Sequence, residues 1–315
     1  MNNSTVDFTT PEASYLFGLV DSRIFVFSIS FLFGLPTHSY VIWLIIRGAG
    51  SGVASEFFFF NLSVCEIGNS LSSMFGLLSY LFSSFTILTY FLQGLGIIGR
   101  PLFQCLMCVE RYLAVIHPVT FLKYKPLRYR AICCTLAWIT TLGSCLFCIF
   151  TLIPFNMKPY VWFFSTAFLF FLSIQLFCLV AVLRALKQSG PGERRREREK
   201  ENHMKRRGFY LILISTMNMV IQYVPFTITG FFVILTQKDI LDIWFPAFLC
   251  YVLAGFVQPV VYLIFLPLFC IKRGLVVLYM FACLFCVFIS VNLQYCCFYS
   301  LSSSSCFVLR LFSEL

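Results

Sequence analysis

Residues 193–235, ERRREREKENHMKRRGFYLILISTMNMVIQYVPFTITGFFVIL, change abruptly from charged to apolar. The stretch from Phe209 to Leu235 contains no Lys, Arg, Asp or Glu. A helix of about 20 apolar residues crosses the ~30 Å hydrocarbon core of a bilayer, so this stretch is long enough to span a membrane. Basic residues beside such a span are typical of its cytoplasmic side.

The same alternation runs through the whole chain. Of its 315 residues, 60% are hydrophobic and 11% are charged, whereas a soluble domain carries about 25% charged residues. The sequence therefore predicts an all-α integral membrane protein, a seven-transmembrane helix bundle. The expected spans are residues 24–46, 57–82, 84–110, 131–153, 161–183, 209–235 and 243–267.

The basic residues are unevenly distributed between the connections. Ten of the 23 Lys and Arg fall between Arg184 and Arg207, and four more between Lys123 and Arg130. This asymmetry predicts a multi-pass membrane protein with an extracellular N-terminus. We expect its location to be the plasma membrane. The net charge of +10 thus belongs to cytoplasmic loops, and we expect no nucleic acid partner.

The two ends of the chain differ from its centre. Residues 1–22 carry three acidic and no basic residues, and Asn2 and Asn3 each begin a glycosylation sequon. Residues 23–272 would form the seven-transmembrane domain. Residues 273–315 form a hydrophobic C-terminal tail, long enough to cross the membrane an eighth time or to lie along the inner leaflet.

Two opposite charges are expected near the centre of the bilayer. At ~1.5 Å per residue, Glu66 lies about 15 Å and Arg100 about 16 Å from the basic ends of their predicted helices. A buried charge costs about 2.5–3.5 kcal/mol on insertion scales, so we predict a Glu66–Arg100 ion pair. The alternative is that each side chain separately reaches water or backbone carbonyls. His38 and Asn218 lie at comparable depth and complete a predicted mid-membrane polar network.

Other patterns are interpreted as packing. The fifteen cysteines lie mostly in apolar blocks, and their C-x-x-C pairs lack further ligands, so no metal or cofactor is expected. Residues 94–99 match the dinucleotide pattern G-x-G-x-x-G but lie in a predicted membrane helix, where glycines allow close helix contact. The chain offers no nucleophile, base and orienting group at usable spacing, so it is not expected to be an enzyme.

The segment Cys108–Pro118, CVERYLAVIHP, resembles the E/DRY-x-x-A-V-x-H-P signature of rhodopsin-like (class A) G protein-coupled receptors, of the non-olfactory type. Further segments resemble this family: Leu62–Glu66 its L-A-x-x-D, Trp138 its helix 4 tryptophan, Tyr223 and Pro225 its C-W-x-P, Gln258, Pro259 and Tyr262 its N-P-x-x-Y, and Cys270 its palmitoylation site.

The resemblance implies a mechanism and partners. Glu110 would restrain Arg111 until the helices separate and Arg111 engages a heterotrimeric G protein. The residues with implied switch or kink roles are Glu110, Arg111, Tyr112, Tyr262, Tyr223, Pro225, Gln258 and Pro259. The implied partners are that G protein, an extracellular ligand and membrane lipid.

Several positions depart from the family pattern. Thr37-His38 replaces the Gly-Asn pair of helix 1, and residues 161–186 contain no proline. Thr86 lies near the expected cysteine and residues 154–160 contain none, so the extracellular disulfide is absent. Arg100 replaces a small polar residue beside the family's sodium site, which predicts sodium-insensitive signalling.

The resemblance also implies a ligand pocket on the outer half of the bundle. Its candidate residues are Gln93, Gly94, Ile97, Thr227 and Phe248. This lining is mainly apolar and contains no acid, which favours a hydrophobic ligand and disfavours an amine. A peptide ligand remains open, and the sequence leaves the receptor an orphan.

Two alternatives stay open from the sequence. The departures from the family pattern also fit a decayed or non-signalling receptor homologue. A polytopic transporter would use Glu66, Arg100 and Gln258 as a mid-membrane relay. Against the transporter, the chain shows no internal repeat.

Overall fold

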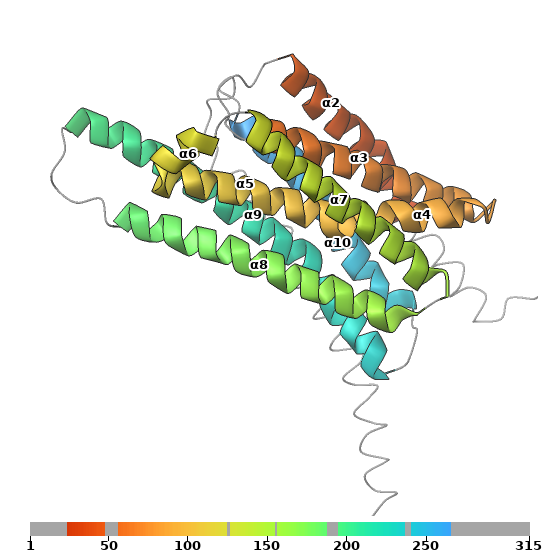
Figure 1. Ribbon diagram of the computed structural model, residues 1–315. Coiled ribbons are helices and arrows are strands. Elements are labelled where there is room, and N and C mark those ends of the chain that lie inside the picture. Colours follow the sequence, from red (N-terminus) through yellow and green to blue (C-terminus); the bar gives the residue numbers. More distant parts are fainter. Residues whose placement is uncertain are drawn as a thin grey trace, which may run out of the picture.

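The computed structural model describes residues 24–47, 56–124, 127–154, 156–187, 195–236 and 241–265. Within these ranges the regular structure is helical, and it forms seven rods that pack side by side (Figure 1). The predicted sites Asn2, Asn3 and Cys270 and the tail 273–315 lie outside the described residues.

The rods follow one another in chain order. The first covers residues 24–46 and contains η1 (Ser30–Gly34) and α2 (Leu35–Ile46). The others are α3 (Glu56–Ser79), the continuous rod α4 (Phe85–Gly94), η2 (Leu95–Gly99) and α5 (Arg100–Ile116), then α7 (Leu127–Leu152), α8 (Met157–Lys187), α9 (Arg195–Thr236) and α10 (Leu241–Phe265). A short helix, α6 (Pro118–Tyr124), connects α5 to α7.

Five rods are long and apolar enough to cross a membrane. These are Ile24–Ile46, Phe85–Ile116, Tyr129–Leu152, Met157–Lys187 and Gly208–Leu235. The helix α3 is less apolar because it buries a polar face, which includes Ser63, Glu66, Asn69 and Ser73. In α10 the apolar part is the shorter segment Ala247–Pro259.

Successive rods run in opposite directions, so alternate connections lie at the same end of the bundle. One end carries the side chains of Arg47, Arg111, Arg130, Arg184 and Arg206, and we call it the basic end. The rod containing α5 runs through the middle of the bundle and contacts α3, α8 and α9 (Figure 1).

Two π-helical segments each precede a proline. The segment η1 ends two residues before Pro36, and η2 ends two residues before Pro101. A proline ring clashes with the carbonyl four residues earlier in an α-helix. The wider π turn accommodates the proline without ending the rod. As a result, Arg100 is the first α-helical residue after a bulge in the central rod.

Glycines bring η2 and its flanks close to neighbouring helices. A Cβ on Gly94 would lie 2.6 Å from the backbone nitrogen of Cys145 in α7, and one on Gly99 would lie 2.9 Å from the Cys65 sulfur in α3. A Cβ on Gly96 would overlap the Tyr251 hydroxyl of α10. The interpretation of residues 94–99 as a helix-packing segment is confirmed.

The cysteines of the two described C-x-x-C pairs act as small packing residues. Cys105, Cys108, Cys145 and Cys148 are buried free thiols. Cys105 donates a hydrogen bond to the Phe171 carbonyl of α8 at 3.3 Å.

Candidate functional site

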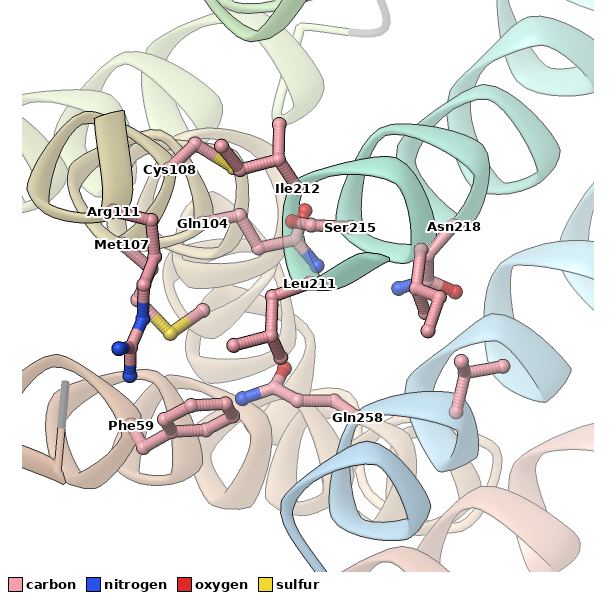
Figure 2. A pocket seen from close by; sticks show the side chains of 12 residues that line it. Phe59, Gln104, Met107, Cys108, Arg111, Leu211, Ile212, Ser215, Asn218 and Gln258 are labelled. Carbon is pink, nitrogen blue, oxygen red and sulfur yellow. The ribbon is translucent and has the colours of Figure 1, made fainter. Parts of the chain in front are cut away.

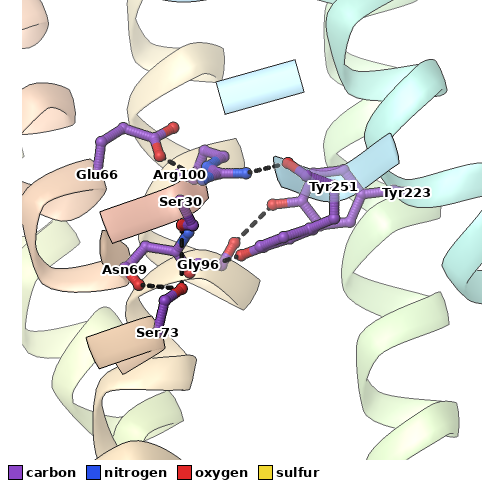
Figure 3. A network of polar contacts seen from close by, with 8 residues as sticks. All are labelled: Ser30, Glu66, Asn69, Ser73, Gly96, Arg100, Tyr223 and Tyr251. Atoms are coloured by element: carbon purple, nitrogen blue, oxygen red, sulfur yellow. Dashed lines mark hydrogen bonds and ion pairs between the residues drawn. The ribbon is translucent and has the colours of Figure 1, made fainter. Parts of the chain in front are cut away.

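The centre of the bundle contains the predicted ion pair. Nη2 of Arg100 donates to a carboxylate oxygen of Glu66, and the side chains are only 1% and 3% exposed. The pair joins α3 to α5 (Figure 3). Burial of either charge without the other would be strongly unfavourable, so the two residues stabilise each other in place.

The guanidinium of Arg100 also contacts the other two helices that face it. With its amide oxygen turned toward Arg100, Gln222 of α9 accepts a hydrogen bond from Nε at 3.1 Å and another from Nη1. The Tyr251 carbonyl of α10 lies 3.5 Å from Nη1, and the Tyr251 ring lies 4.5 Å below Cζ. One cation therefore links α3, α5, α9 and α10. We call Glu66, Arg100, Gln222 and Tyr251 the arginine cluster.

Neutral hydrogen bonds extend from this cluster (Figure 3). The Tyr223 hydroxyl of α9 donates to the Gly96 carbonyl in η2 at 2.6 Å. The Tyr251 hydroxyl donates to Asn69 of α3 at 3.3 Å. These bonds use carbonyl and amide oxygens that would otherwise be buried without partners.

His38 lies beside the cluster rather than within it. Its ring is 2% exposed, and its neighbours include Gly255 of α10. A Cβ on Gly255 would lie 3.5 Å from Arg100 Nη2 and 3.6 Å from Glu66 Oε2. The absence of a side chain at Gly255 lets the α10 backbone approach the ion pair closely.

A separate cavity lies between the arginine cluster and the basic end. Figure 2 shows the side chains that line it. Its volume is about 40 Å³. The side chains around it come from α3, α5, α9 and α10. The lining includes Phe59, Gln104, Met107, Arg111, Leu211, Ser215, Asn218 and Gln258. Arg111 thus faces the space that separates α5 from α9 and α10.

The polar groups around this cavity are incompletely paired. Within the described residues, the buried side-chain atoms without a hydrogen-bond partner include Oε1 of Gln104, Oδ1 of Asn218, and both Oε1 and Nε2 of Gln258. They belong to α5, α9 and α10. The arginine cluster differs in this respect, because its guanidinium has several hydrogen-bond acceptors around it.

The predicted network is therefore divided in two. Glu66 and Arg100 pair, and His38 lies next to them, but Asn218 lines the cavity with Gln258. Asn218 has the predicted depth but faces a different space.

The Glu110–Arg111–Tyr112 segment lies near the basic end of α5, which continues to Ile116. Glu110 forms an ion pair with Arg130 of α7 at 2.5 Å, a contact that the sequence analysis did not predict. The Tyr112 hydroxyl lies 3.3 Å from His117 Nε2. Tyr262 lies in α10, but its side chain is outside the described part.

At the opposite end, aromatic rings fill the predicted ligand region. Phe226 of α9 packs against Trp244 and Phe248 of α10, with ring centroids 5.0 and 5.5 Å apart. Tyr223, two residues before Pro225, packs between Phe164 and Phe168 of α8, at 5.3 and 5.7 Å.

The other predicted pocket residues lie in different surroundings. Gln93 donates to the Tyr160 hydroxyl of α8 at 2.9 Å. Ile97 is buried in the ring-rich core, and the Thr227 hydroxyl bonds to the Tyr223 carbonyl of its own helix. Gly94 faces Cys145 of α7 and provides close helix packing there.

Several partners were not predicted from the sequence, although their spacing along the helices offered a signal. Gln104 and Arg111 follow Arg100 by four and eleven residues, so they share a face of α5. Tyr251 precedes Gln258 by seven residues, which places both on one face of α10. Gln222 is one of two amides, with Asn218, in an otherwise apolar run. An uncharged amide in a membrane span needs a buried partner, and that need was the available clue.

These features define a class of protein: a seven-helix membrane bundle with a buried charge cluster and an arginine facing an internal cavity at its basic end. The family model "7 transmembrane receptor (rhodopsin family)" matches residues 38–262. The chain belongs to the rhodopsin family of seven-transmembrane receptors.

Two curated relatives are chemokine receptors. C-C chemokine receptor type 8 of Homo sapiens is 24% identical over 243 residues, which cover 67% of this chain and 63% of that receptor. Chemokine XC receptor 1 of Mus musculus is 24% identical over 240 residues, 70% of this chain and 69% of that receptor. The chain thus matches less than two thirds of the length of the human receptor.

Proposed function

We propose that this receptor transmits an extracellular signal to a heterotrimeric G protein by a population shift between two helix arrangements. The observation that carries the proposal is the position of Arg111, which lines a cavity whose far side is formed by α9 and α10. Movement of α9 away from α5 would open this cavity toward the cytoplasm and expose Arg111 to a partner.

The arginine cluster supplies the restraint on that movement. Gln222 binds the fixed cation from α9, while Glu66 and Tyr251 bind it from α3 and α10. Separation of α9 at this level removes the Gln222 contact. The arrangement seen here is therefore the inactive one, and Pro225, three residues further along α9, is the proposed pivot.

The rings at the opposite end provide a route from ligand to cluster. Phe226 contacts Tyr251 with ring centroids 6.2 Å apart, and Tyr251 in turn lies against the Arg100 guanidinium. A ligand that displaced Phe226 or Trp244 would shift Tyr251 and weaken the hold of Arg100 on α9. A ligand that took the place of these rings would lie among apolar and aromatic side chains, which favours a hydrophobic small molecule.

A second ligand class is a chemokine-like protein. The similarity to two chemokine receptors favours it. The two classes make different demands on the chain. Responses to a small hydrophobic ligand should be lost in Phe226→Ala and kept after deletion of residues 2–20. Responses to a protein ligand should depend on that extracellular tail.

The test of coupling compares wild type with Arg111→Ala at matched surface expression, with several second messengers read in the absence of ligand. Arg47→Ala is the control, because Arg47 is another arginine of the basic end but stacks on Trp43 at 4.8 Å. We expect the basal signal to fall in Arg111→Ala and to persist in Arg47→Ala.

The same comparison is repeated in a Gln222→Leu background, where the proposed restraint on α9 is removed and basal output should be higher. Surface-expressed receptor that gives no Arg111-dependent signal in either background would refute coupling and support a non-signalling homologue.

A further inference from the structure

Pro101 interrupts the main-chain hydrogen bonds of the central rod. In a π-helical turn, an N–H bonds to the carbonyl five residues earlier, and the N–H of Arg100 bonds in this way to the Leu95 carbonyl of η2. The next residue, Pro101, has no N–H. In this register its missing donor would have reached the carbonyl of Gly96. The proline therefore leaves the Gly96 carbonyl without that main-chain donor.

The hydroxyl of Tyr223 takes the place of the missing donor. It comes from α9 and donates to the Gly96 carbonyl at 2.6 Å (Figure 3). Tyr223 is 1% exposed and Gly96 is buried. A main-chain carbonyl inside a bilayer has no water to bond, so it needs a donor within the protein. This one bond satisfies the carbonyl freed by the proline and attaches α9 to the central rod.

The bond lies next to the arginine cluster. A Cβ on Gly96 would overlap the Tyr251 hydroxyl, so the missing side chain lets α10 reach the same turn of the rod. The rings of Tyr223 and Tyr251 meet edge to face, with centroids 6.4 Å apart, and the Tyr251 ring lies against the guanidinium of Arg100. A change in η2 would therefore reach the cluster both through these rings and through the main chain.

The Tyr223 bond and the π register depend on each other. In an α-helical register, the ring of Pro101 would clash with the carbonyl four residues earlier, that of Ile97, and kink the rod. The carbonyl without a donor would then be that of Ile97 rather than Gly96. Successive residues lie about 100° apart around a helix, so this carbonyl would point away from Tyr223. The Tyr223 hydroxyl thus binds an acceptor that only the π register presents to it.

We propose that Pro101 and Tyr223 form a register latch. Pro101 frees the Gly96 carbonyl, and Tyr223 binds that carbonyl and so keeps the central rod in the π register. Tyr223 is a positioning residue, because it acts on Arg100 through the main chain of the rod. Departure of α9 would release the carbonyl, and the rod would relax to a proline kink that turns Arg100 relative to residues 85–94. The latch is a property of the fold, and only this last step rests on the proposed function.

Thermal unfolding of the purified full-length receptor tests the latch without ligand or G protein. In the wild type, Tyr223→Phe leaves the Gly96 carbonyl buried without a donor, which should lower Tm. In Pro101→Ala, the new N–H donates to that carbonyl. Tyr223→Phe should then lower Tm by less than half as much as in the wild type. Alanine is the best helix former, so the Pro101→Ala variant should fold.

The matched control is Pro36→Ala. Pro36 follows the other π-helical segment, η1, in the first rod. In this background Tyr223→Phe should lower Tm as much as in the wild type. Equal losses from Tyr223→Phe in the wild type and in Pro101→Ala would overturn the latch, and so would an equal reduction of the loss by both proline substitutions. Pro101→Leu, which also restores the N–H, is the second variant if Pro101→Ala does not fold.

The link to signalling is measured separately. Tyr223→Phe should raise the basal second-messenger output, and the increase should be smaller in the Pro101→Ala background. An Arg111-dependent signal that Tyr223→Phe does not change would overturn this link. If the Tm differences are as expected but no background gives an Arg111-dependent signal, the latch is supported and the coupling proposal fails. The two failures are therefore distinguishable.

Discussion

Arg100 and Gln104 lie one turn apart on the same helix, but their surroundings are opposite in character. The guanidinium of Arg100 has Glu66, Gln222 and the Tyr251 carbonyl around it. The amide oxygen of Gln104 has no partner within the described protein and faces a cavity. Direct contacts of the arginine cluster hold four helices together. The cavity nearer the basic end instead leaves space between three of these helices.

This difference shows how one bundle can combine a rigid level with a movable one. A buried charge enforces its contacts because their loss leaves an uncompensated ion in a low-dielectric interior. The neutral amides around the cavity fix the positions of their helices only weakly, because water can replace each of their contacts at small cost. The energetic consequences of substitution should therefore differ sharply between the two levels.

The largest effect is expected for Arg100→Leu, which leaves Glu66 buried and unpaired. Removal of one partner of a buried pair costs about 3–5 kcal/mol. Surface expression should fall severely, as should the thermal stability of the purified protein. Addition of Glu66→Leu should recover part of both. Strictly additive losses in the double variant would show that the pair contributes no coupling.

The next effect is expected for Gln222→Leu, which removes the α9 acceptor from the cluster. Hydrogen bonds to charged groups contribute about 1.5–3 kcal/mol, so the loss of stability should fall in this range. Basal signalling should rise because α9 is released. The matched control is Gln175→Leu in α8, a fully buried amide whose described donor contact is to the Cys105 sulfur at 3.6 Å. Equal changes in stability and basal signalling in the two variants would show that Gln222 has no specific role in holding α9.

A smaller effect is expected for Tyr223→Phe. The ring keeps its packing between Phe164 and Phe168, and the 2.6 Å bond to the Gly96 carbonyl is lost. A neutral hydrogen bond contributes about 0.5–1.5 kcal/mol, and thermal unfolding should detect a loss of this size. A loss as large as that of Gln222→Leu would mean that the arginine cluster depends on the η2 bulge.

The smallest effect on stability is expected for Gln104→Leu. Its amide oxygen makes no protein hydrogen bond, so an apolar residue of similar size should change the free energy of unfolding by less than about 1 kcal/mol. Basal signalling should decrease because dry contacts then hold α9 to α5. A loss of several kcal/mol in thermal unfolding would show that the residues around the cavity contribute as much to stability as the arginine cluster, against our expectation.

The sequence by itself determined the class of the molecule and the depth of its charges. Apolar length and loop charge are one-dimensional properties, and the energetics of the bilayer act on them directly. For the same reason, counting residues along two helices was enough to bring Glu66 and Arg100 to one level, and the high energy of an unpaired charge made their pairing predictable.

Only the tertiary structure decided which polar groups at the same depth in the bundle also face the same surroundings. Asn218 has the depth of the arginine cluster but lines the cavity, while Gln222, four residues later, meets Arg100. Gly94, one of the predicted pocket residues, packs closely against α7. Sequence spacing fixes the relative directions of side chains within one helix, but the rotation and tilt of each helix are set by packing against its neighbours.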